Sequence, residues 1–532
     1  MNNVSQLPIV FIIFLIMLLV ISIRGTNLSN ILYISAVASP SHFLWSQQFS
    51  SILASNGHNV TLLNIYKEGK QNNLHFLKLD GVDNALSLDH SVDYLALHSM
   101  SPLELLFSFF ELEYMVCEHS IASKQFLKLL NYPKHFTFNL IIHDHLAGPC
   151  LLLLLKRFNF PPLIMASASN ILSSVECIMG SLTYPGFIPS SLRDPPETFG
   201  YLDRIYNYML TTYEFLFKRY YSDPRIDSLI QSRFQNITSV SRLESTAVVV
   251  LMNSITLLET PEPQIWRVVN VGGLHITAPK MLPEFLYQHA NRTYEKCVLI
   301  SFGSNLKLDS LNNFIAQTII TVAQLLPNFI FLWKVDIQKP AIEGLIPENV
   351  ITSDWFPQND ILGSGMVDVL FTHGGLLTIQ EAMWHGIPML GTPNYGDQYQ
   401  NVHRIEKLGI GKKLYLEELN PVSLKGNLLG IIHNERYKQR ATAIAKTIRD
   451  EQITPQRKAL WTVEWVLRNY GTIQLLDDLN EVGYIEKNSL DVLSTLIIIS
   501  ICINFLLFRI IQVCVSFMTA RVVRKNKMKK TP

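Results

Sequence analysis

A histidine and an aspartate in the first half of this 532-residue chain are placed where they could move a proton together. His42 follows an apolar, strand-like run and begins a helix-like stretch, and Asp144 ends the apolar run that starts at Leu140. Both would therefore lie at the carboxyl edge of a parallel sheet, where open α/β sheets bind ligands. Imidazole suits a general base because its ordinary pKa is about 6.5, and a neighbouring carboxylate can orient the ring.

Each of these residues also has a plain structural explanation. A histidine in the first turn of a helix can simply be solvated, and an aspartate close to Gly148 and Pro149 can cap a helix. His143 and His145 flank Asp144, and the alternation of side chains along a strand would point them away from it. The choice between a catalytic pair and two structural residues depends on the rest of the chain.

A longer pattern in the second half predicts a binding site for negative charge. The apolar run from Val367 to Phe371 ends at Thr372-His373-Gly374-Gly375, and residues at helical spacing follow. A strand, a glycine turn and a helix N-terminus attract anions, because unpaired amides and the helix dipole point at the turn. Glu381 and Asp397-Gln398 come next and could reach hydroxyl groups. Phosphate donors beside hydroxyl acceptors suit a nucleotide sugar.

The segment from Phe371 to Gln398 resembles the signature of the UDP-glycosyltransferase family, in which Thr-His-Gly-Gly, Glu, two prolines and Asp-Gln follow one another. Trp355-Phe-Pro-Gln358 and Ser301-Phe-Gly-Ser304 are similar to two further elements of that family. Leu377 and Thr378 stand where vertebrate members usually carry Asn and Gly. This form resembles the insect branch of membrane-bound members, which is mostly associated with UDP-glucose.

The resemblance implies a fold class and a reaction. The fold would be α/β of the GT-B type, with two Rossmann-like domains facing each other across a cleft and a C-terminal transmembrane helix. The reaction would be inverting, metal-independent transfer of a hexose to a hydroxyl group of a small lipophilic acceptor, a conjugation of the detoxification type. His42 and Asp144 match the catalytic dyad of the family. No cofactor is expected, because the UDP-sugar is a co-substrate.

The resemblance also assigns residues of the second domain to the donor. Those expected at the diphosphate are Ser304, Thr372, His373, Gly374 and Gly375, with Thr378 as a further donor. Trp355 would stack on uracil, Gln358 would hold the base or the ribose, and Glu381 would take the ribose hydroxyls. Asp397 and Gln398 would hold the sugar.

Two alternatives remain open. Glucose is the preferred donor sugar, but no residue of the motif discriminates it from glucuronate by charge. A chain of this fold could also be a catalytically silent carrier or subunit, and association with itself or with a related chain is left open. Nucleic acid is not an expected partner, because the formal net charge is only +1.

Both ends of the chain are apolar. Residues 1–25 are predicted to be a signal peptide, because Pro8 to Ile23 has the length of a signal h-region. An uncleaved anchor is the alternative, and both would place the body in the secretory lumen. Residues 491–513 are predicted to be a transmembrane helix among membrane lipids, and residues 514–532 a basic cytosolic tail.

The tail gives the predicted location. Lys529 and Lys530 stand fourth and third from the C-terminus and resemble the dilysine retrieval signal of endoplasmic-reticulum membrane proteins. A generic cluster of basic residues that stops membrane transfer is the alternative. We therefore expect a single-pass type I protein of the endoplasmic-reticulum membrane with a lumenal catalytic body.

The body is predicted to form an acceptor-binding domain, 26–270, and a UDP-sugar-binding domain, 271–490. A linker is expected at 268–283, long acceptor-side loops and helices at 185–242, and helices at 42–55, 147–156 and 455–470, the last crossing back to the first domain. The expected strands are 31–36, 60–65, 140–143, 163–166, 296–302, 329–335, 350–352, 367–371 and 387–390.

The cysteines and sequons of the body complete the expectations. Four cysteines in so long a body suggest no disulfide framework and no zinc site: Cys117, Cys150, Cys177 and Cys297. Acceptor sequons for N-glycosylation lie at Asn27, Asn59, Asn236 and Asn291. Asn236 and Asn291 are the better candidates, because Asn59 begins an expected strand and Asn27 lies close to the predicted cleavage point.

Overall fold

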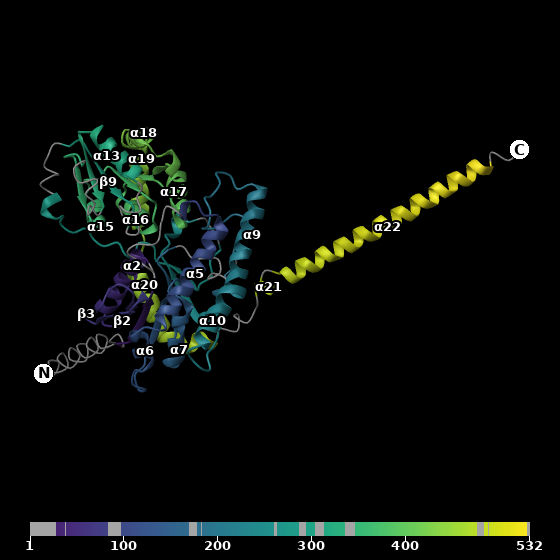
Figure 1. Ribbon diagram of the computed structural model, residues 1–532, viewed down its shortest axis with the longest axis horizontal. Helices are drawn as coiled ribbons and strands as arrows, with labels where there is room; N and C mark the ends of the chain where they lie inside the picture. The colour runs from purple at the N-terminus through teal and green to yellow at the C-terminus, as the bar shows by residue number, and fades with distance from the viewer. Residues whose placement is uncertain are drawn as a thin grey trace, which may run out of the picture. The chain divides into compact units, whose positions relative to one another are not determined.

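A computed structural model describes residues 28–528, apart from residues 38, 83–96, 170–177, 182, 260–262, 287–293, 304–312, 336–345, 476–483 and 488. The chain divides into two compact units, Met1–Gly471 and Thr472–Pro532. The first unit contains two β-sheets flanked by helices (Figure 1). The two α/β halves predicted from the alternation of strands and helices are therefore confirmed.

The first sheet has eight strands in the order β3-β4-β2-β1-β5-β6-β7-β8, all parallel except β3, which runs antiparallel to β4. Its strands are β1 (Asn30–Ser35), β2 (Asn59–Asn64), β3 (Gly69–Gln71), β4 (Leu74–Lys78), β5 (Leu140–Asp144), β6 (Leu163–Ser167), β7 (Ala247–Met252) and β8 (Val268–Asn270). The central strands are nearly continuous apolar runs because helices cover the sheet on both faces.

The second sheet has six parallel strands in the order β11-β10-β9-β12-β13-β14. They are β9 (Lys296–Ser301), β10 (Phe329–Lys334), β11 (Val350–Ser353), β12 (Val369–Thr372), β13 (Met389–Gly391) and β14 (Gly411–Lys413). The order 3-2-1-4-5-6 by position in the chain is that of the Rossmann fold. Its ligand crevice opens between β9 and β12, where the strand order reverses.

Helices cover both sheets. Those of the first half are α2 (Pro40–Ser55), α5 (Pro102–Ser120), α6 (Lys124–Leu130), η1 (Pro149–Leu152), α7 (Leu153–Arg157), α9 (Tyr201–Phe217), η2 (Lys218–Ser222), α10 (Asp223–Gln231), α11 (Val240–Glu244) and η3 (Thr256–Leu258). Those of the second half are α13 (Asn313–Gln324), α15 (Gln358–Gly363), α16 (Leu376–His385), α17 (Asp397–Lys407), η4 (Leu416–Glu418), α18 (Pro421–Ile432), α19 (Glu435–Arg449) and α20 (Pro455–Leu475).

The last helix of the first unit, α20, packs on the first domain, as predicted for its crossing back. The rings of Trp465 and Trp266 meet edge-on with centroids 5.9 Å apart. Nε2 of His58 lies 3.9 Å from a carboxylate oxygen of Glu464. Part of the predicted linker is wrong, because Val268–Asn270 forms β8 and pairs with β7.

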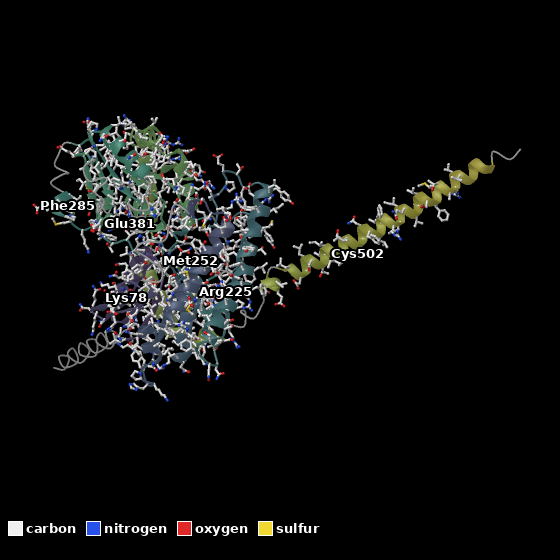
Figure 2. All side chains as sticks on the ribbon, in the orientation of Figure 1. Lys78, Arg225, Met252, Phe285, Glu381 and Cys502 are labelled. Atoms are coloured by element: carbon white, nitrogen blue, oxygen red, sulfur yellow. A yellow bond between two sulfur atoms is a disulfide. The ribbon has the colours of Figure 1, made fainter. Side chains whose placement is uncertain are left out.

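The second unit contains α21 (Tyr484–Lys487) and α22 (Leu490–Met528). Residues Leu490–Val523 are long and apolar enough to cross a membrane, with a mean hydropathy of 2.4. Their large apolar side chains, from Val492 onward, are exposed around the helix (Figure 2). The predicted span 491–513 lies inside this helix, which continues into the predicted tail. The predicted signal peptide, Lys529 and Lys530 lie outside the described residues.

Candidate active site

The two predicted catalytic residues lie where the strand order of the first sheet reverses. Strand β1 is flanked by β2 on one side and β5 on the other, so the crevice at their carboxyl ends is a natural ligand site. His42 lies in the first turn of α2, just after β1, and Asp144 is the last residue of β5. Pro40 begins α2 and has the fixed backbone angle that a first helical residue needs.

The side chains of this pair are in direct contact. Nδ1 of His42 lies 2.9 Å from Oδ2 of Asp144, and their side chains are 9% and 0% exposed. An ionised carboxylate can only accept a hydrogen bond, so Nδ1 carries a proton, and in the neutral tautomer that this contact favours the lone pair lies on Nε2. No described residue is hydrogen-bonded to that Nε2. The arrangement is that of a general base held by its orienting carboxylate.

The surroundings of Asp144 favour its charged form. Burial alone would raise the pKa of its carboxyl, but the interactions with His42, with His145 and with the amide of Leu146 leave it below the ordinary value. The Leu146 amide donates to Oδ1 over 3.1 Å, and Nδ1 of His145 lies 3.8 Å from the same oxygen. The expectation that His145 points away from Asp144 is therefore wrong, because β5 ends before it and strand alternation no longer applies.

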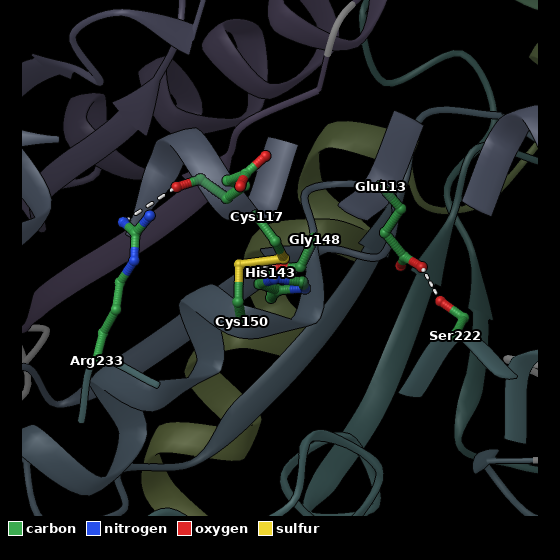
Figure 3. Close-up of a disulfide and its surroundings, with 8 residues drawn as sticks. Glu113, Cys117, His143, Gly148, Cys150, Ser222 and Arg233 are labelled. Carbon is green, nitrogen blue, oxygen red and sulfur yellow. Dashed lines mark hydrogen bonds between the residues drawn. A yellow bond between two sulfur atoms is a disulfide. The ribbon is translucent and has the colours of Figure 1, made fainter. Parts of the chain in front are cut away.

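A disulfide anchors the loop that follows Asp144 (Figure 3). Cys117 of α5 is bonded to Cys150 of η1, a single disulfide that the expectation of no disulfide framework did not include. The packing of α5 on η1 brings the two cysteines together. Their spacing in the sequence does not predict this bond. His143 does point away from the dyad, and its Nε2 lies 3.2 Å from the carbonyl oxygen of Gly148 in the same loop.

The donor motif of the second domain takes the predicted form of strand, glycine turn and helix. Thr372 ends β12, Gly374 has φ +90°, and α16 begins after Gly375 without a side-chain cap. Only glycine adopts the Gly374 conformation at low cost, and a Cβ there would also lie 2.5 Å from a methyl group of Val402. The amides of this helix N-terminus are thus free for an anion.

The ring of His373 is held between two glycines. A Cβ on Gly303 would lie 2.7 Å from its Cε1, and a Cβ on Gly375 would lie 2.7 Å from its Nε2. Burial, with a smaller effect of the nearby Lys334 charge, lowers the pKa of His373 to about 4. His373 is therefore a neutral hydrogen-bonding group near pH 7, and Thr372 lies beside it, with Oγ1 3.3 Å from Nδ1.

Gln358, Thr378 and Glu381 form one hydrogen-bonded group. The amide nitrogen of Gln358 donates to Oε2 of Glu381 over 2.6 Å and to Oγ1 of Thr378 over 3.1 Å. Burial raises the pKa of Glu381 to about 7. The ring of Trp355 is 55% exposed, and the ammonium of Lys334 lies 4.6 Å from its centroid. An exposed indole beside buried polar groups can stack on a base while they bind its ribose.

The start of α17 brings the donor side of the site close to the dyad. Asn401 donates to Oδ2 of Asp397 over 3.1 Å and to the carbonyl oxygen of Gly374 over 3.0 Å. Burial raises the pKa of Asp397, and the charge of His42 acts in the opposite direction. Asp397 is thus held beside the glycine turn of the donor motif. The oxygen of Gln398 accepts from the Asn394 amide over 2.9 Å and fixes this loop.

The structure describes every predicted site residue except Ser304 and brings His42 into contact with Asp144, Gln358 with Thr378 and Glu381, and Thr372 with His373 and Gly374. It adds three residues that the sequence reasoning missed. Lys334 ends β10 beside Trp355, Asn401 joins the glycine turn to Asp397, and His275 lies 3.8 Å from Glu381. Lys334 could have been found from the sequence, because a lysine at the end of an apolar strand is unusual. Asn401 and His275 could not, because only the folding of the chain brings them to the site. No group of three or more His, Cys, Asp or Glu suited to a metal ion occurs in the described part.

Comparison with known proteins agrees with this geometry. Residues 40–529 match the family described as UDP-glucoronosyl and UDP-glucosyl transferase. UDP-glucuronosyltransferase 2B15 of Homo sapiens is 26% identical over 431 residues, which cover 80% of this chain and 78% of that protein. UDP-glucuronosyltransferase 2B14 of Oryctolagus cuniculus is 27% identical over 397 residues, which cover 74% and 73% of the two chains.

Solved structures share the fold. The calicheamicin glycosyltransferase CalG4 matches with a TM-score of 0.54 and 16% identity, covering 83% of this chain and 99% of that one. A UDP-glucosyltransferase from Polygonum tinctorium, capable of glucosylating indoxyl, matches with a TM-score of 0.54 and 15% identity over 83% and 99% of the chains. The predicted GT-B fold is confirmed. The match over nearly the whole chain, together with the fold, shows that this protein belongs to the UDP-glucuronosyl and UDP-glucosyl transferase family of glycosyltransferases.

Proposed function

We propose that this glycosyltransferase moves a hexose from a UDP-sugar to a hydroxyl group of a small lipophilic acceptor, with inversion at the sugar and without a metal ion. The observation that carries the proposal is the 2.9 Å contact between His42 and Asp144. Nε2 of His42 takes the acceptor proton as the oxygen attacks the anomeric carbon. Attack from the face opposite the leaving UDP inverts that carbon.

Asp144 makes this proton transfer favourable in two ways. It holds the imidazole with Nδ1 protonated, so that Nε2 faces the acceptor as a base. It also stabilises the imidazolium that forms, because the two groups are buried together and their attraction is screened little by water. Mutation of such a base typically costs about 10²–10⁴ in rate.

The donor domain holds the leaving group. The free amides at the start of α16 and the neutral His373 bind the diphosphate, and Ser304 adds a hydroxyl in the role that the family resemblance gives it. Trp355 stacks on uracil, and Gln358 with Glu381 binds the ribose. Asp397 and Gln398 hold the sugar, with Asn401 fixing the position of the Asp397 carboxylate. These donors supply the charge stabilisation that a metal would otherwise provide.

Glucose is the proposed sugar, and two cations of the elements that follow Asp397, one on α17 and one on β14, are already paired with carboxylates. Arg404 is bonded to Glu259, and Lys413 lies 3.2 Å from Asp194. A glucuronate carboxylate would need a free cation, whereas glucose needs only hydroxyl partners such as Asp397. Glucuronate is the second candidate, because the curated relatives of this chain are UDP-glucuronosyltransferases.

The proposed location is the endoplasmic-reticulum membrane, with the body in the lumen and α22 as the single anchor. Residues 1–25 would act as the signal peptide, and Lys529 with Lys530 as the retrieval signal. A conjugating enzyme in this position would meet acceptors that partition into lipid, which agrees with a detoxification role.

One experiment tests the proposal against a silent carrier of the same fold. Microsomes that contain the full chain are assayed with UDP-glucose and UDP-glucuronate against a panel of phenols, beside His42→Ala and the exposed control His433→Ala. We expect glucosylation by wild type and His433→Ala, and loss of about 10²-fold or more in His42→Ala with UDP binding unchanged. UDP binding without turnover on any donor would support the carrier, and equal activity of His42→Ala would refute the base.

A further inference from the structure

Helix α9 has its polar side buried and its apolar side exposed, the reverse of a surface helix in a soluble protein. Asn207, Thr211 and Glu214 point inward and are at most 6% exposed. Outward-facing Leu202 and Met209 are 77% and 63% exposed. The helix lies along one side of the first domain beside α5 and continues through η2 into α10 (Figure 1).

Polar contacts fix this orientation. Asn207 donates to the carbonyl oxygens of Pro185 and Ile188 over 2.9 and 2.7 Å, and it accepts from the Ser190 amide over 2.7 Å. Just after α9, the ammonium of Lys218 lies 3.0 Å from Asp223 and 3.1 Å from Glu244, all three buried. Turning the apolar side inward would break these contacts and leave buried polar groups without partners. The exposed apolar side is therefore built into the domain.

The exposed side is broad and rich in tyrosine. Besides Leu202 and Met209 it includes Tyr201, which is 70% exposed, Ile205, which is 42% exposed, and Tyr220 of η2, which continues α9 and is 74% exposed. It continues onto α5, where the half-exposed ring of Phe107 meets that of Phe217 with centroids 5.9 Å apart. Contiguous apolar surface of this kind marks a site that another apolar body covers.

The chemistry of this surface and the chain that follows it favour a lipid bilayer. Tyrosines with aliphatic side chains and arginines are the composition of the membrane–water boundary, and the guanidinium of Arg204 lies 5.7 Å from the ring of Tyr201. Residues 472–489 connect the body to α22, a reach of at most about 60 Å. If α22 is anchored, the body can never leave the neighbourhood of the bilayer.

We propose that the exposed side of α9, defined here by Tyr201, Leu202, Ile205, Met209 and Tyr220, docks into the headgroup layer of the membrane that holds α22. This inference rests on the membrane anchoring proposed above. It gives the acceptor domain a lipid-facing surface of its own, so that the domain receiving lipophilic acceptors lies against the phase in which they dissolve.

Photolabelling of the full chain tests the docking. The protein is placed at one copy per nanodisc in phosphatidylcholine that contains a diazirine-bearing acyl chain, irradiated and digested with trypsin. We expect lipid adducts on the peptide 205–218 and on peptides of α22. The peptide 414–425 serves as the internal control, because it carries Val422 of α18, which is 82% exposed and belongs to the other domain.

A double variant makes the test specific. Leu202→Glu with Met209→Glu should lower the α9 adducts at least fivefold while the α22 adducts stay constant, whereas Val422→Glu should change neither. Adducts on α22 with none on α9 in wild type would overturn the docking and leave the anchor intact. Absence of adducts on both would refute the anchor itself. Labelling of α9 only when two copies share a disc would assign the surface to a second copy and also overturn the proposal.

Discussion

The proton on Nδ1 of His42 is the smallest feature on which the proposed reaction depends. It stays there because the Asp144 carboxylate can only accept. In Asp144→Asn the amide N–H can donate to Nδ1 of His42. The proton of the ring would then lie on Nε2, which would face the acceptor as a donor instead of a base. We expect kcat to fall about 10²–10⁴-fold while UDP affinity is unchanged, as measured by steady-state kinetics and calorimetry. A loss of UDP binding in step with kcat would show that Asp144 is structural.

A second residue-scale prediction concerns the buried His143. Burial lowers the pKa of His143 to about 4. Between pH 4 and 6.5 this histidine is therefore protonated in the unfolded chain but not in the folded chain. Its contribution to stability is thus complete above pH 6.5 and is lost as pH falls. Glutamine does not titrate, so His143→Gln has no such pH dependence. The free energy of unfolding of wild type, relative to that of His143→Gln, should therefore fall by about 2 kcal/mol between pH 7.5 and pH 5.

The measurement is urea unfolding of both proteins at the two pH values, with the disulfide intact. A difference between wild type and His143→Gln that is the same at both pH values would show that folding does not shift the pKa of this histidine. A difference that grows toward pH 5 would give the opposite sign and would mean that the folded state stabilises the charged ring.

At the scale of elements, the disulfide between α5 and η1 holds the loop that leaves the catalytic strand. It closes a segment of sequence separation 33, for which the loss of chain entropy predicts about 3–4 kcal/mol of stability. Cys117→Ala with Cys150→Ala should lower the melting temperature and reduce kcat, because the backbone after Asp144 loses its anchor. The KM for the UDP-sugar should stay constant, since the donor residues lie in the other domain.

Cys297→Ala is the matched control for this pair, because Cys297 is a buried free cysteine of the second domain. It should leave kcat unchanged. Unchanged kcat and melting temperature in the double variant would show that the loop is held by its other contacts, such as that of His143 with Gly148.

Elements with a strong local pattern could be predicted from the sequence, and the others could not. Several strands with apolar runs fall within a few residues of their expected bounds, as β5 and β9 show. Strand β7 is an exception: all six of its residues are apolar, yet it is not among the expected strands. The hairpin of β3 and β4 is not among the expected strands, because β3 is short and polar and β4 mixes apolar with polar residues over only five positions. Strand β14, which has only three residues, is not among them either. Strand β8 falls within the predicted linker 268–283, because the glycines that predict a linker follow this strand directly.

The candidate site divides in the same way. The dyad and the donor motif were predictable because each follows a strand and carries residue types that chemistry selects. The link between Asp397 and the glycine turn through Asn401 was not, because its geometry arises from the packing of α17 against α16 and β14. The same holds for the disulfide, since two cysteines 33 residues apart meet only when α5 packs on η1.

At the scale of the whole molecule, the C-terminal lysines decide where the enzyme resides if they act as a retrieval signal. Lys529→Ser with Lys530→Ser should let the protein travel beyond the endoplasmic reticulum, so that a glycan at Asn236 becomes resistant to endoglycosidase H. Asn236 is exposed and lies between α10 and α11, which makes it accessible for glycosylation. Lys525→Ser with Lys527→Ser removes the same charge at another offset and should leave the glycan sensitive.

Membrane attachment should persist in both variants, because the apolar side chains of α22 and not the lysines hold a helix in a bilayer. Fully sensitive glycans in the variant without Lys529 and Lys530 would place retention in the lumenal body. Glycans resistant to endoglycosidase H in both variants would show that retention depends on the total positive charge of the tail.

The position of α20 has a consequence for the time course of biosynthesis. Val463 and Val466 of this helix are fully buried, and Trp465 packs on Trp266 of the first domain. The first domain emerges from the ribosome long before α20 is synthesised, because the second domain lies between them in the sequence. At 5–20 residues per second this delay lasts roughly 10–40 s. During that interval the nascent first domain presents an uncovered apolar surface, which is the kind of surface that chaperones bind.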